Sequence, residues 1–283
     1  MQFLSEPGGG SDVAGAQTTA VRDGDEWVLN GSKIWTTGAW WSDWGLCLAR
    51  TNWDAPKHRG LSVFMLRIHQ PGIDVHRIEM LNGSREFCQE FLTDLRIPDT
   101  DRIGEVGDGW KVATTTLMNE RVSIGGGAAP REGGMIASAA AAWRANPELR
   151  TPGLHDRLLR LWADAEVARL AGARLRQQLA AGQPGPEGSA AKIVFARLNQ
   201  EISEFEVELA GAEGLRYDDW TMRRPETVSF YGRDAGYRYL RARGNSIEGG
   251  TSEILRNIIA ERVLGLPPEI RVDKGVPWKD LPR

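Results

Sequence analysis

The sequence predicts an α+β protein in which a β-barrel or β-sandwich domain is followed by an all-α helical bundle. Two observations support this expectation. Residues 1 to about 105 contain short strand-forming segments separated by turn residues. The residues after Pro98 show helical periodicity instead. A chain of 283 residues is long enough for two domains, which we place at 1–105 and 106–283.

The first half alternates strand-forming stretches with turns. Residues 17–22 and 27–35 are the clearest pair, because the D-G-D-E turn between them contains a glycine and predicts a hairpin. Further strands are expected at Leu46–Thr51, Leu61–Ile68, Ile73–Ile78 and Phe87–Ile97. Six of the eleven tryptophans fall between Trp27 and Trp53, where they either fill a barrel core or build a platform for a flat ring.

The second half predicts a bundle of amphipathic helices. One helix is indicated by apolar residues that recur on a single face: Leu154, Leu158, Leu161, Trp162 and Ala165. The stretch A-G-Q-P-G-P-E-G (181–188) predicts a loop, because proline and glycine cannot continue a helix there. The helical pattern resumes over Ala190–Gly211.

The sequence also predicts where two of the helices begin and end. The run Gly125-Gly126-Gly127 predicts the end of a helix that begins near Trp110. Ser252–Leu264 predicts the last helix, with Thr251 as its N-cap and with Gly265 and Pro267 as stop signals.

Composition excludes some classes of function. The net charge is −3 and the pI about 5.9, so the basic excess typical of nucleic-acid binders is absent. No apolar run is long enough to span a membrane and the N-terminus does not resemble a signal peptide, so we expect a cytoplasmic protein. Cys47 and Cys88 are expected to be reduced thiols, although a disulfide stays possible. The four histidines have no zinc-binding spacing, and we expect no metal site.

Four stretches fit a ligand site, and each also has a plainer interpretation. S-E-P-G-G-G-S-D (5–12) can offer backbone amides to a phosphate, or it is a surface turn. K-I-W-T-T-G-A (33–39) places two hydroxyls after Trp35, or it ends a strand whose tryptophan lies in the core.

The other two stretches carry carboxylates. In L-M-N-E-R-V-S-I-G (117–125), Glu120 is either a solvated partner of Arg121 or a base whose pKa is raised by burial in a dry site. In N-S-I-E-G-G-T-S-E-I (245–254), the Gly-Gly pair at a helix start admits a ligand, or it is a glycine-rich turn with a threonine cap.

In this order and at these separations, the four stretches resemble the acyl-CoA dehydrogenases, a family of flavoproteins. I-P-D-T-D-R-I-G-E-V-G-D-G-W (97–110) resembles the family's passage from β-domain to helices. The resemblance runs from residue 2 to about 267. It implies FAD-dependent α,β-dehydrogenation of an acyl-CoA thioester to the trans-2-enoyl-CoA, as in β-oxidation of fatty acids, with electrons passed to an electron-transfer flavoprotein.

The resemblance also implies site residues. Trp35 would pack beside the isoalloxazine ring, and the Thr37 hydroxyl would point toward its N5. The full set of expected cofactor contacts is Gln2, Leu4, Ser5, Gly10, Ser11, Trp35, Thr37, Thr251 and Glu253. The expected substrate contacts are Ser11, Met118, Arg121 and Gly250.

The catalytic base is expected at Glu120, with Glu248 as the runner-up. Many family members carry the base in an I-Y-E-G-T context, and I-E-G-G-T here places Gly249 at that position, so Glu248 stands one residue early. One residue near a helix start rotates a side chain by roughly 100°. A smaller group, which resembles isovaleryl-CoA and long-chain dehydrogenases, carries the base in L-x-x-E-R, and L-M-N-E-R (117–121) matches it. This type of base favours branched, bulky or long acyl groups.

Some family elements are not found. The sequence begins inside the first signature, whereas family members usually carry helices before it. The aromatic-Gly-Gly motif is reduced to L-A-G-A-E-G (209–214), and the R-x-x-F-G element is missing. Two alternatives to an active dehydrogenase therefore stay open: a non-catalytic or heteromeric partner subunit of one, and a helical scaffold without flavin. A homo- or heteromeric dimer or tetramer is expected.

Overall fold

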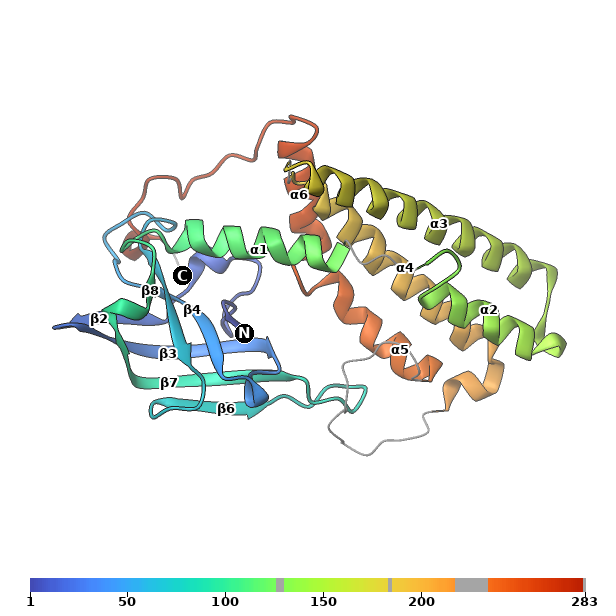
Figure 1. Cartoon of the computed structure of the whole chain (residues 1–283), viewed down its shortest axis with the longest axis horizontal. Coiled ribbons are helices and arrows are strands. Elements are labelled where there is room, and N and C mark those ends of the chain that lie inside the picture. Colours follow the sequence, from blue (N-terminus) through green and yellow to red (C-terminus); the bar gives the residue numbers. More distant parts are fainter. Residues whose placement is uncertain (126–129, 183–184, 217–233, 282–283) are drawn as a thin grey trace. The chain divides into compact units, whose positions relative to one another are not determined.

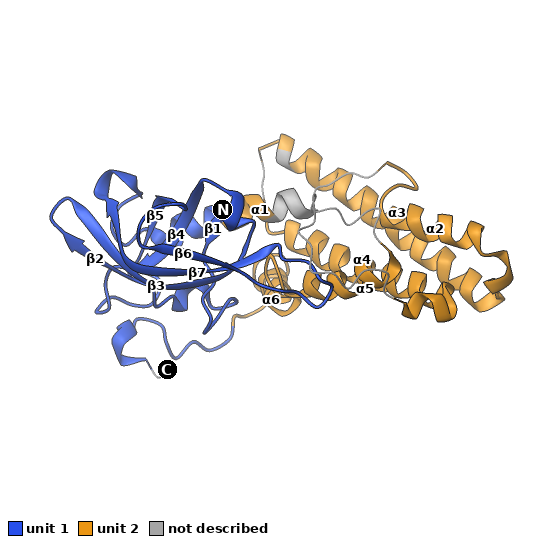
Figure 2. Ribbon diagram, turned by 90° about the horizontal axis from the view of Figure 1, so that it is seen from below, with its two compact units in different colours: residues 1–116, 222–226, 269–283 blue, residues 117–221, 227–268 orange. Residues whose placement is uncertain are grey.

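The computed structural model of the chain describes residues 1–125, 130–182, 185–216 and 234–281. These residues form two compact units (Figure 2). Met1–Thr116 and the residues from Glu269 onward form the first unit, and the described residues from Leu117 to Pro268 form the second. The fold is α+β as predicted, with the strands in the first unit and most of the helices in the second.

The first unit contains an eight-stranded mixed sheet (Figure 1). Its strands are β1 (Gln2–Phe3), β2 (Thr19–Asp23), β3 (Glu26–Thr37), β4 (Trp44–Arg50), β5 (Leu61–Arg67), β6 (Ile73–Arg77), β7 (Phe87–Pro98) and β8 (Arg102–Ile103). Hydrogen-bonded neighbours follow the order β6-β7-β3-β2-β4-β5-β8, and β1 pairs with β4. The hairpin of β2 and β3 and the four further strands are confirmed. β1 and β8 escaped prediction because two residues are too short for a periodicity.

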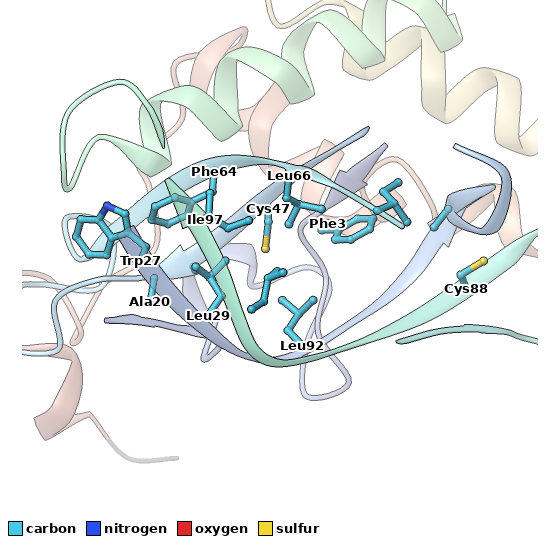
Figure 3. Packing of buried hydrophobic residues seen from close by; sticks show 14 residues of the cluster. Phe3, Ala20, Trp27, Leu29, Cys47, Phe64, Leu66, Cys88, Leu92 and Ile97 are labelled. Atoms are coloured by element: carbon cyan, nitrogen blue, oxygen red, sulfur yellow. The ribbon is translucent and has the colours of Figure 1, made fainter. Parts of the chain in front are cut away.

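Alternation along the strands builds one core (Figure 3). β5 and β7 are not neighbours in the sheet, yet Phe64 and Leu66 of β5 share a cluster with Leu92 and Leu95 of β7. The sheet is therefore curved, so that distant strands turn their apolar faces to one another. Each such fully buried side chain contributes about 1.5–3 kcal/mol relative to exposure.

Both cysteines lie in this core as free thiols, as predicted. Burial raises the pKa of Cys47 to about 11. The thiol of Cys47 therefore stays protonated and unreactive at neutral pH.

The end of the chain returns to the first unit. The backbone N–H of Trp278 donates to the carbonyl of Ala55 at 3.0 Å, and that of Lys279 donates to Trp53 at 3.1 Å. The Trp278 ring packs 4.6 Å from the guanidinium carbon of Arg50, which is fully buried. The C-terminal segment is thus anchored on the sheet by a tryptophan–arginine contact.

The helices are α1 (Gly109–Gly125), α2 (Met135–Ala145), α3 (Pro152–Ala180), α4 (Gly188–Leu209), α5 (Ala235–Ala242) and α6 (Ser252–Arg262). A Cβ at Gly109 would lie 2.6 Å from the backbone of Leu61, so glycine lets α1 begin against β5. Gly126 and Gly127, expected to end this helix, lie outside the described residues. None of the described helices is both long and apolar enough to cross a membrane.

The second unit is held by one apolar cluster. Leu158 and Leu161 of α3 pack with Ile202 and Phe205 of α4 and with Ile136 of α2. Leu154, Trp162 and Ala165 pack against this cluster, which confirms the predicted apolar face of α3. α6 also begins as predicted, because the Thr251 hydroxyl accepts a hydrogen bond from the Ile254 amide at 3.2 Å.

Candidate active site

The glycine-rich loop after β1 is closed by Glu6. The backbones of Glu6 and Gly9 exchange two hydrogen bonds, of 3.2 and 2.9 Å. The Glu6 carboxylate accepts hydrogen bonds from the amides of Gln17 (2.7 Å) and Thr18 (2.9 Å) and from the ammonium of Lys33 (2.8 Å). These contacts give the loop one defined path between β1 and β2.

The electrostatics of Glu6 follow from these partners. Burial by itself would raise the pKa of Glu6, but the charge of Lys33 and the hydrogen bonds from Lys33, Thr18 and Gln17 outweigh it. The pKa of Glu6 therefore lies below its usual value, and the carboxylate is ionised at neutral pH.

The glycines of this loop are not required by the protein's own packing. A Cβ at Gly8 or Gly9 would meet no atom within 4 Å, and neither residue has a positive φ. A Cβ at Gly10 would lie 3.5 Å from the Ser5 hydroxyl oxygen, an ordinary contact. Bare backbone at an open surface can be approached closely by a ligand.

Trp35 has an unusual backbone conformation. Its φ is +67°, in the left-handed region that large side chains rarely adopt. The register of β3 against β7 shifts here, because Ile34 pairs with Gln89 and Thr36 with Cys88, which leaves Trp35 as the extra residue of a β-bulge. Strained residues of this kind cluster at functional sites.

The bulge determines which side chains face outward. Trp35 is 52% exposed and Thr37 is exposed, whereas Thr36 between them is buried. The indole of Trp35 meets the ring of Phe87 edge-on, with centroids 6.0 Å apart. An exposed aromatic side chain with an exposed hydroxyl two residues away can receive a flat heteroaromatic ring.

Several predicted cofactor contacts gather beside this strand. The Ile34 amide donates to the carbonyl of Ser5 at 3.0 Å, and the Lys33 ammonium donates to that of Leu4 at 3.3 Å. Leu4 and Ser5 therefore run next to the residues that precede the bulge. Gln2 begins the same segment and pairs with Leu46 of β4, while Ser11 is exposed further along the loop.

The second unit carries the proposed base. Glu120 lies on α1 with a partly exposed side chain, and Met118 on the same helix is 53% exposed. The side chain of Arg121 lies outside the described residues.

Glu248, the runner-up base, is held in an ion pair. The guanidinium of Arg241 donates to its two carboxylate oxygens at 3.0 and 2.9 Å, and the amide of Asn245 donates to one of them at 2.6 Å. The Arg241 side chain is 7% exposed. A bidentate pair with a buried arginine fixes the direction of the Glu248 carboxylate.

The turn that follows Glu248 is held by its backbone. Gly249 and Gly250 have φ angles of +61° and +91°, which glycine adopts most readily. The ammonium of Lys192, from α4, donates to the Gly250 carbonyl at 2.7 Å. Thr251 uses its hydroxyl for the N-cap of α6, and Glu253 is an exposed partner of Arg256 at 3.4 Å. The turn thus presents a fixed backbone at the start of a helix.

Among the residues that the structure describes, seven buried charged side chains were missed at the sequence level: Lys33, Arg50, Glu86, Glu90, Lys192, Glu206 and Arg241. A signal existed for Lys33, because it continues the two-residue spacing of the inward-facing Trp27 and Leu29. No group of three or more His, Cys, Asp or Glu side chains that could hold a metal ion occurs within the part of the chain that the structure describes.

Two protein-family models match the chain. "Acyl-CoA dehydrogenase, middle domain" matches residues 2–94, which include the sheet through most of β7. "Acyl-CoA dehydrogenase, C-terminal domain" matches residues 107–264, which include the six α-helices of the described residues.

Curated relatives carry the same family name. The chain is 37% identical over 276 residues to "Acyl-CoA dehydrogenase FadE34" of Mycobacterium tuberculosis, an alignment that covers 94% of this chain and 35% of the relative. It is 34% identical over 270 residues to "Acyl-CoA dehydrogenase IpdE1" of the same organism, with 95% and 67% covered. The chain therefore spans about a third of FadE34 and two thirds of IpdE1.

Solved structures show the same fold. The structure described as "Tcur3481-Tcur3483 steroid ACAD" superposes with a TM-score of 0.80 at 28% identity, over 95% of this chain and 68% of that one. The "ChsE4-ChsE5 complex from Mycobacterium tuberculosis" gives a TM-score of 0.75 at 29% identity, over 95% and 69%.

Proposed function

This chain belongs to the acyl-CoA dehydrogenase family, and from that premise we propose that it takes part in the α,β-dehydrogenation of an acyl-CoA thioester to the trans-2-enoyl-CoA. The members of this family are flavoprotein oxidoreductases, and FAD is the cofactor that we propose here. When bound, FAD supplies the acceptor for the hydride that leaves the β-carbon. The electrons are then passed to an electron-transfer flavoprotein.

The first unit offers residues that fit the flavin. Trp35 is a half-exposed aromatic side chain, and the exposed hydroxyl of Thr37 lies on the same strand. Ser5 and the backbone of Leu4 line the strand next to it. In this proposal, Trp35 and Thr37 orient the isoalloxazine ring, and Gly10 and Ser11 allow close approach of the cofactor and the pantetheine chain.

The second unit offers the groups for proton removal. The partly exposed Glu120 carboxylate takes the proton from the α-carbon. Negative charge develops on the thioester oxygen as the proton leaves. The backbone amides of the Gly249–Gly250 turn, with the N-terminus of α6 behind them, stabilise that charge. Met118 and Arg121 border the substrate, and Thr251 and Glu253 border the cofactor.

The ion pair of Arg241 and Glu248 is the reason why we propose Glu120, and not Glu248, as the base. Both carboxylate oxygens of Glu248 already accept hydrogen bonds from the Arg241 guanidinium, and Asn245 donates to one of them. Glu248 therefore supports the backbone of the turn, and proton abstraction is assigned to Glu120.

The test is spectroscopic. The purified chain is incubated with FAD, and unbound FAD is removed. The ratio of flavin absorbance to protein concentration then gives the amount of FAD bound per chain. Acyl-CoA thioesters are then added without oxygen, in a panel of straight, branched and polycyclic acyl groups. Binding of one FAD per chain and bleaching by at least one thioester are expected. A protein that binds FAD but is bleached by no member of the panel would contradict the proposed activity.

A second candidate is a partner subunit of a heteromeric dehydrogenase. It is favoured by the similar structures that are described as "ChsE4-ChsE5 complex" and "Tcur3481-Tcur3483 steroid ACAD". In that case, the chain alone would neither retain FAD nor bleach, and substitution of Glu120 would leave the activity of the assembled heteromer unchanged. The native mass and that one variant distinguish the two candidates.

A further inference from the structure

Glu90 is a carboxyl group fully enclosed in the sheet. It lies on β7, where the inward-facing residues Cys88, Glu90 and Leu92 alternate with outward-facing ones, and its exposure is 0%. In the register of the sheet, Glu90 stands opposite Lys33 of β3 and opposite Val75 of β6. Lys33 is also fully buried.

The charge of Lys33 is paired with a carboxylate other than Glu90. Its ammonium donates to the carboxylate of Glu6 at 2.8 Å and to the carbonyl of Leu4 at 3.3 Å. Glu6 and Lys33 thus neutralise one another in the core. Glu90 is a second buried carboxylate beside this pair, and it forms no ion pair of its own within the described residues.

Within the described part of the chain, the Glu90 carboxyl accepts a hydrogen bond from one other side chain, whereas a buried ionised carboxylate would need several donors. Its Oε2 accepts from the Thr36 hydroxyl at 3.0 Å, and its Oε1 is buried without a partner among the described residues. Burial therefore raises the pKa of Glu90 to about 7, although the hydrogen bond from Thr36 and the charge of Lys33 act in the opposite direction.

Among the residues that the structure describes, the remaining titratable groups near Glu90 do not supply a counter-charge. Cys47 of β4 and Cys88 of β7 are neutral thiols whose pKa values are raised by burial. On β6, Arg77 stacks on Trp40 at 4.2 Å and donates to the carbonyl of Arg85.

The side-chain hydrogen bond to Glu90 comes from Thr36, the residue next to the bulge. Thr36 faces the core only because the bulge at Trp35 shifts the alternation of β3 by one residue. Without that shift, Thr37 would face inward and Thr36 outward. Glu90 therefore binds the residue that lies between the two exposed side chains, Trp35 and Thr37.

We propose that Glu90 is a positioning residue, which binds Thr36 from inside the sheet and thereby fixes the outward direction of Trp35 and Thr37 at the ring-binding surface. The link to the ring rests on the flavin function proposed above. The proposal that Glu90 stabilises the bulge is independent of the flavin. It rests on the hydrogen bond from Thr36, on the register of β3 against β7 and on the burial of Glu90. Ionisation of Glu90 changes the strength of its contact with Thr36, so the surroundings of Trp35 respond to pH.

The test follows the fluorescence of Trp35 in the chain without added flavin. The chain has eleven tryptophans, so the emission of Trp35→Phe is subtracted from that of the wild type. The difference spectrum is expected to titrate with a midpoint near pH 7. Glu90→Gln should abolish this titration, and each variant is first shown to be folded by circular dichroism at pH 5.5.

Thr36 supplies the matched variants. Thr36→Val removes the hydrogen bond that lowers the pKa of Glu90, so the midpoint should rise by about one unit. Thr36→Ser keeps a hydroxyl and should restore the wild-type midpoint. A titration that persists in Glu90→Gln, or a midpoint that does not move in Thr36→Val, overturns the proposal.

The same samples separate this inference from the proposed function. With FAD added, the visible flavin spectrum of the wild type should shift over the same pH range, and that of Glu90→Gln should not. Failure of the wild type to take up FAD would refute the proposed function, while the fluorescence of the chain without flavin would still decide the role of Glu90.

Discussion

Arg241 donates hydrogen bonds from its two terminal nitrogens to the two carboxylate oxygens of Glu248, at 3.0 and 2.9 Å. The pair joins α5 to the turn that precedes α6, and Asn245 completes it. Glu248 is therefore part of the support of the Gly249–Gly250 turn. The assignment of Glu120 as the base depends on this relationship.

The two glutamates should differ sharply in catalysis. Glu120→Gln is expected to slow flavin reduction by an acyl-CoA by about 10²–10⁴-fold, because a general base is lost. Glu248→Gln keeps a residue of the same size and should retain a measurable rate of reduction. Anaerobic stopped-flow absorbance compares the two. An equal loss in a well-folded Glu248→Gln would reverse the assignment.

The Arg241–Glu248 pair should be strongly coupled in stability. Arg241→Ala alone is expected to lower the free energy of unfolding by about 3 kcal/mol, since it leaves a carboxylate with its main partner removed. The double variant Arg241→Ala with Glu248→Ala should lose less than the sum of the single changes. Urea denaturation of the four proteins measures the coupling. If the losses in the free energy of unfolding were additive, the contact between Arg241 and Glu248 would contribute nothing to stability.

Trp278 should anchor the C-terminal segment. Its side chain is 8% exposed and lies over Arg50, so Trp278→Ala is expected to cost about 3 kcal/mol of stability. Ile270 belongs to the same segment but is 95% exposed, and Ile270→Ala should change stability by less than about 0.5 kcal/mol. Thermal and denaturant unfolding check both variants. Similar effects of the two changes would show that Trp278 is not an anchor.

The buried carboxyl of Glu90 should make stability depend on pH. Its pKa is raised from 4.5 to about 7 in the folded chain, so the folded state holds the proton over a range in which the unfolded state has lost it. Stability contributed by this group is present below pH 4.5 and is lost as the pH rises through 7. The stability of the wild type relative to Glu90→Gln should therefore fall by about 3 kcal/mol across this window. A constant difference between the two proteins from pH 4.5 to 8 would contradict this expectation.

Local sequence was sufficient for most of the secondary structure. The hairpin of β2 and β3, the apolar face of α3 and the N-cap at Thr251 all follow from residues that are close together in the chain. The family motifs are also short stretches of neighbouring residues, and the matches to the two domain models confirm the family. The bulge at Trp35 could not be predicted, because it is visible only as a shift in register against β7.

The sequence by itself determined which faces of the strands and helices are apolar and which short stretches resemble a flavin and thioester site, because both depend on local spacing and residue type. Only the tertiary structure decided which charges meet. Lys33 reaches Glu6 across 27 positions and Lys192 reaches Gly250 across 58. Pairing in the core depends on strand register and helix packing between distant segments, and the cost of burying a charge selects the few arrangements that satisfy it.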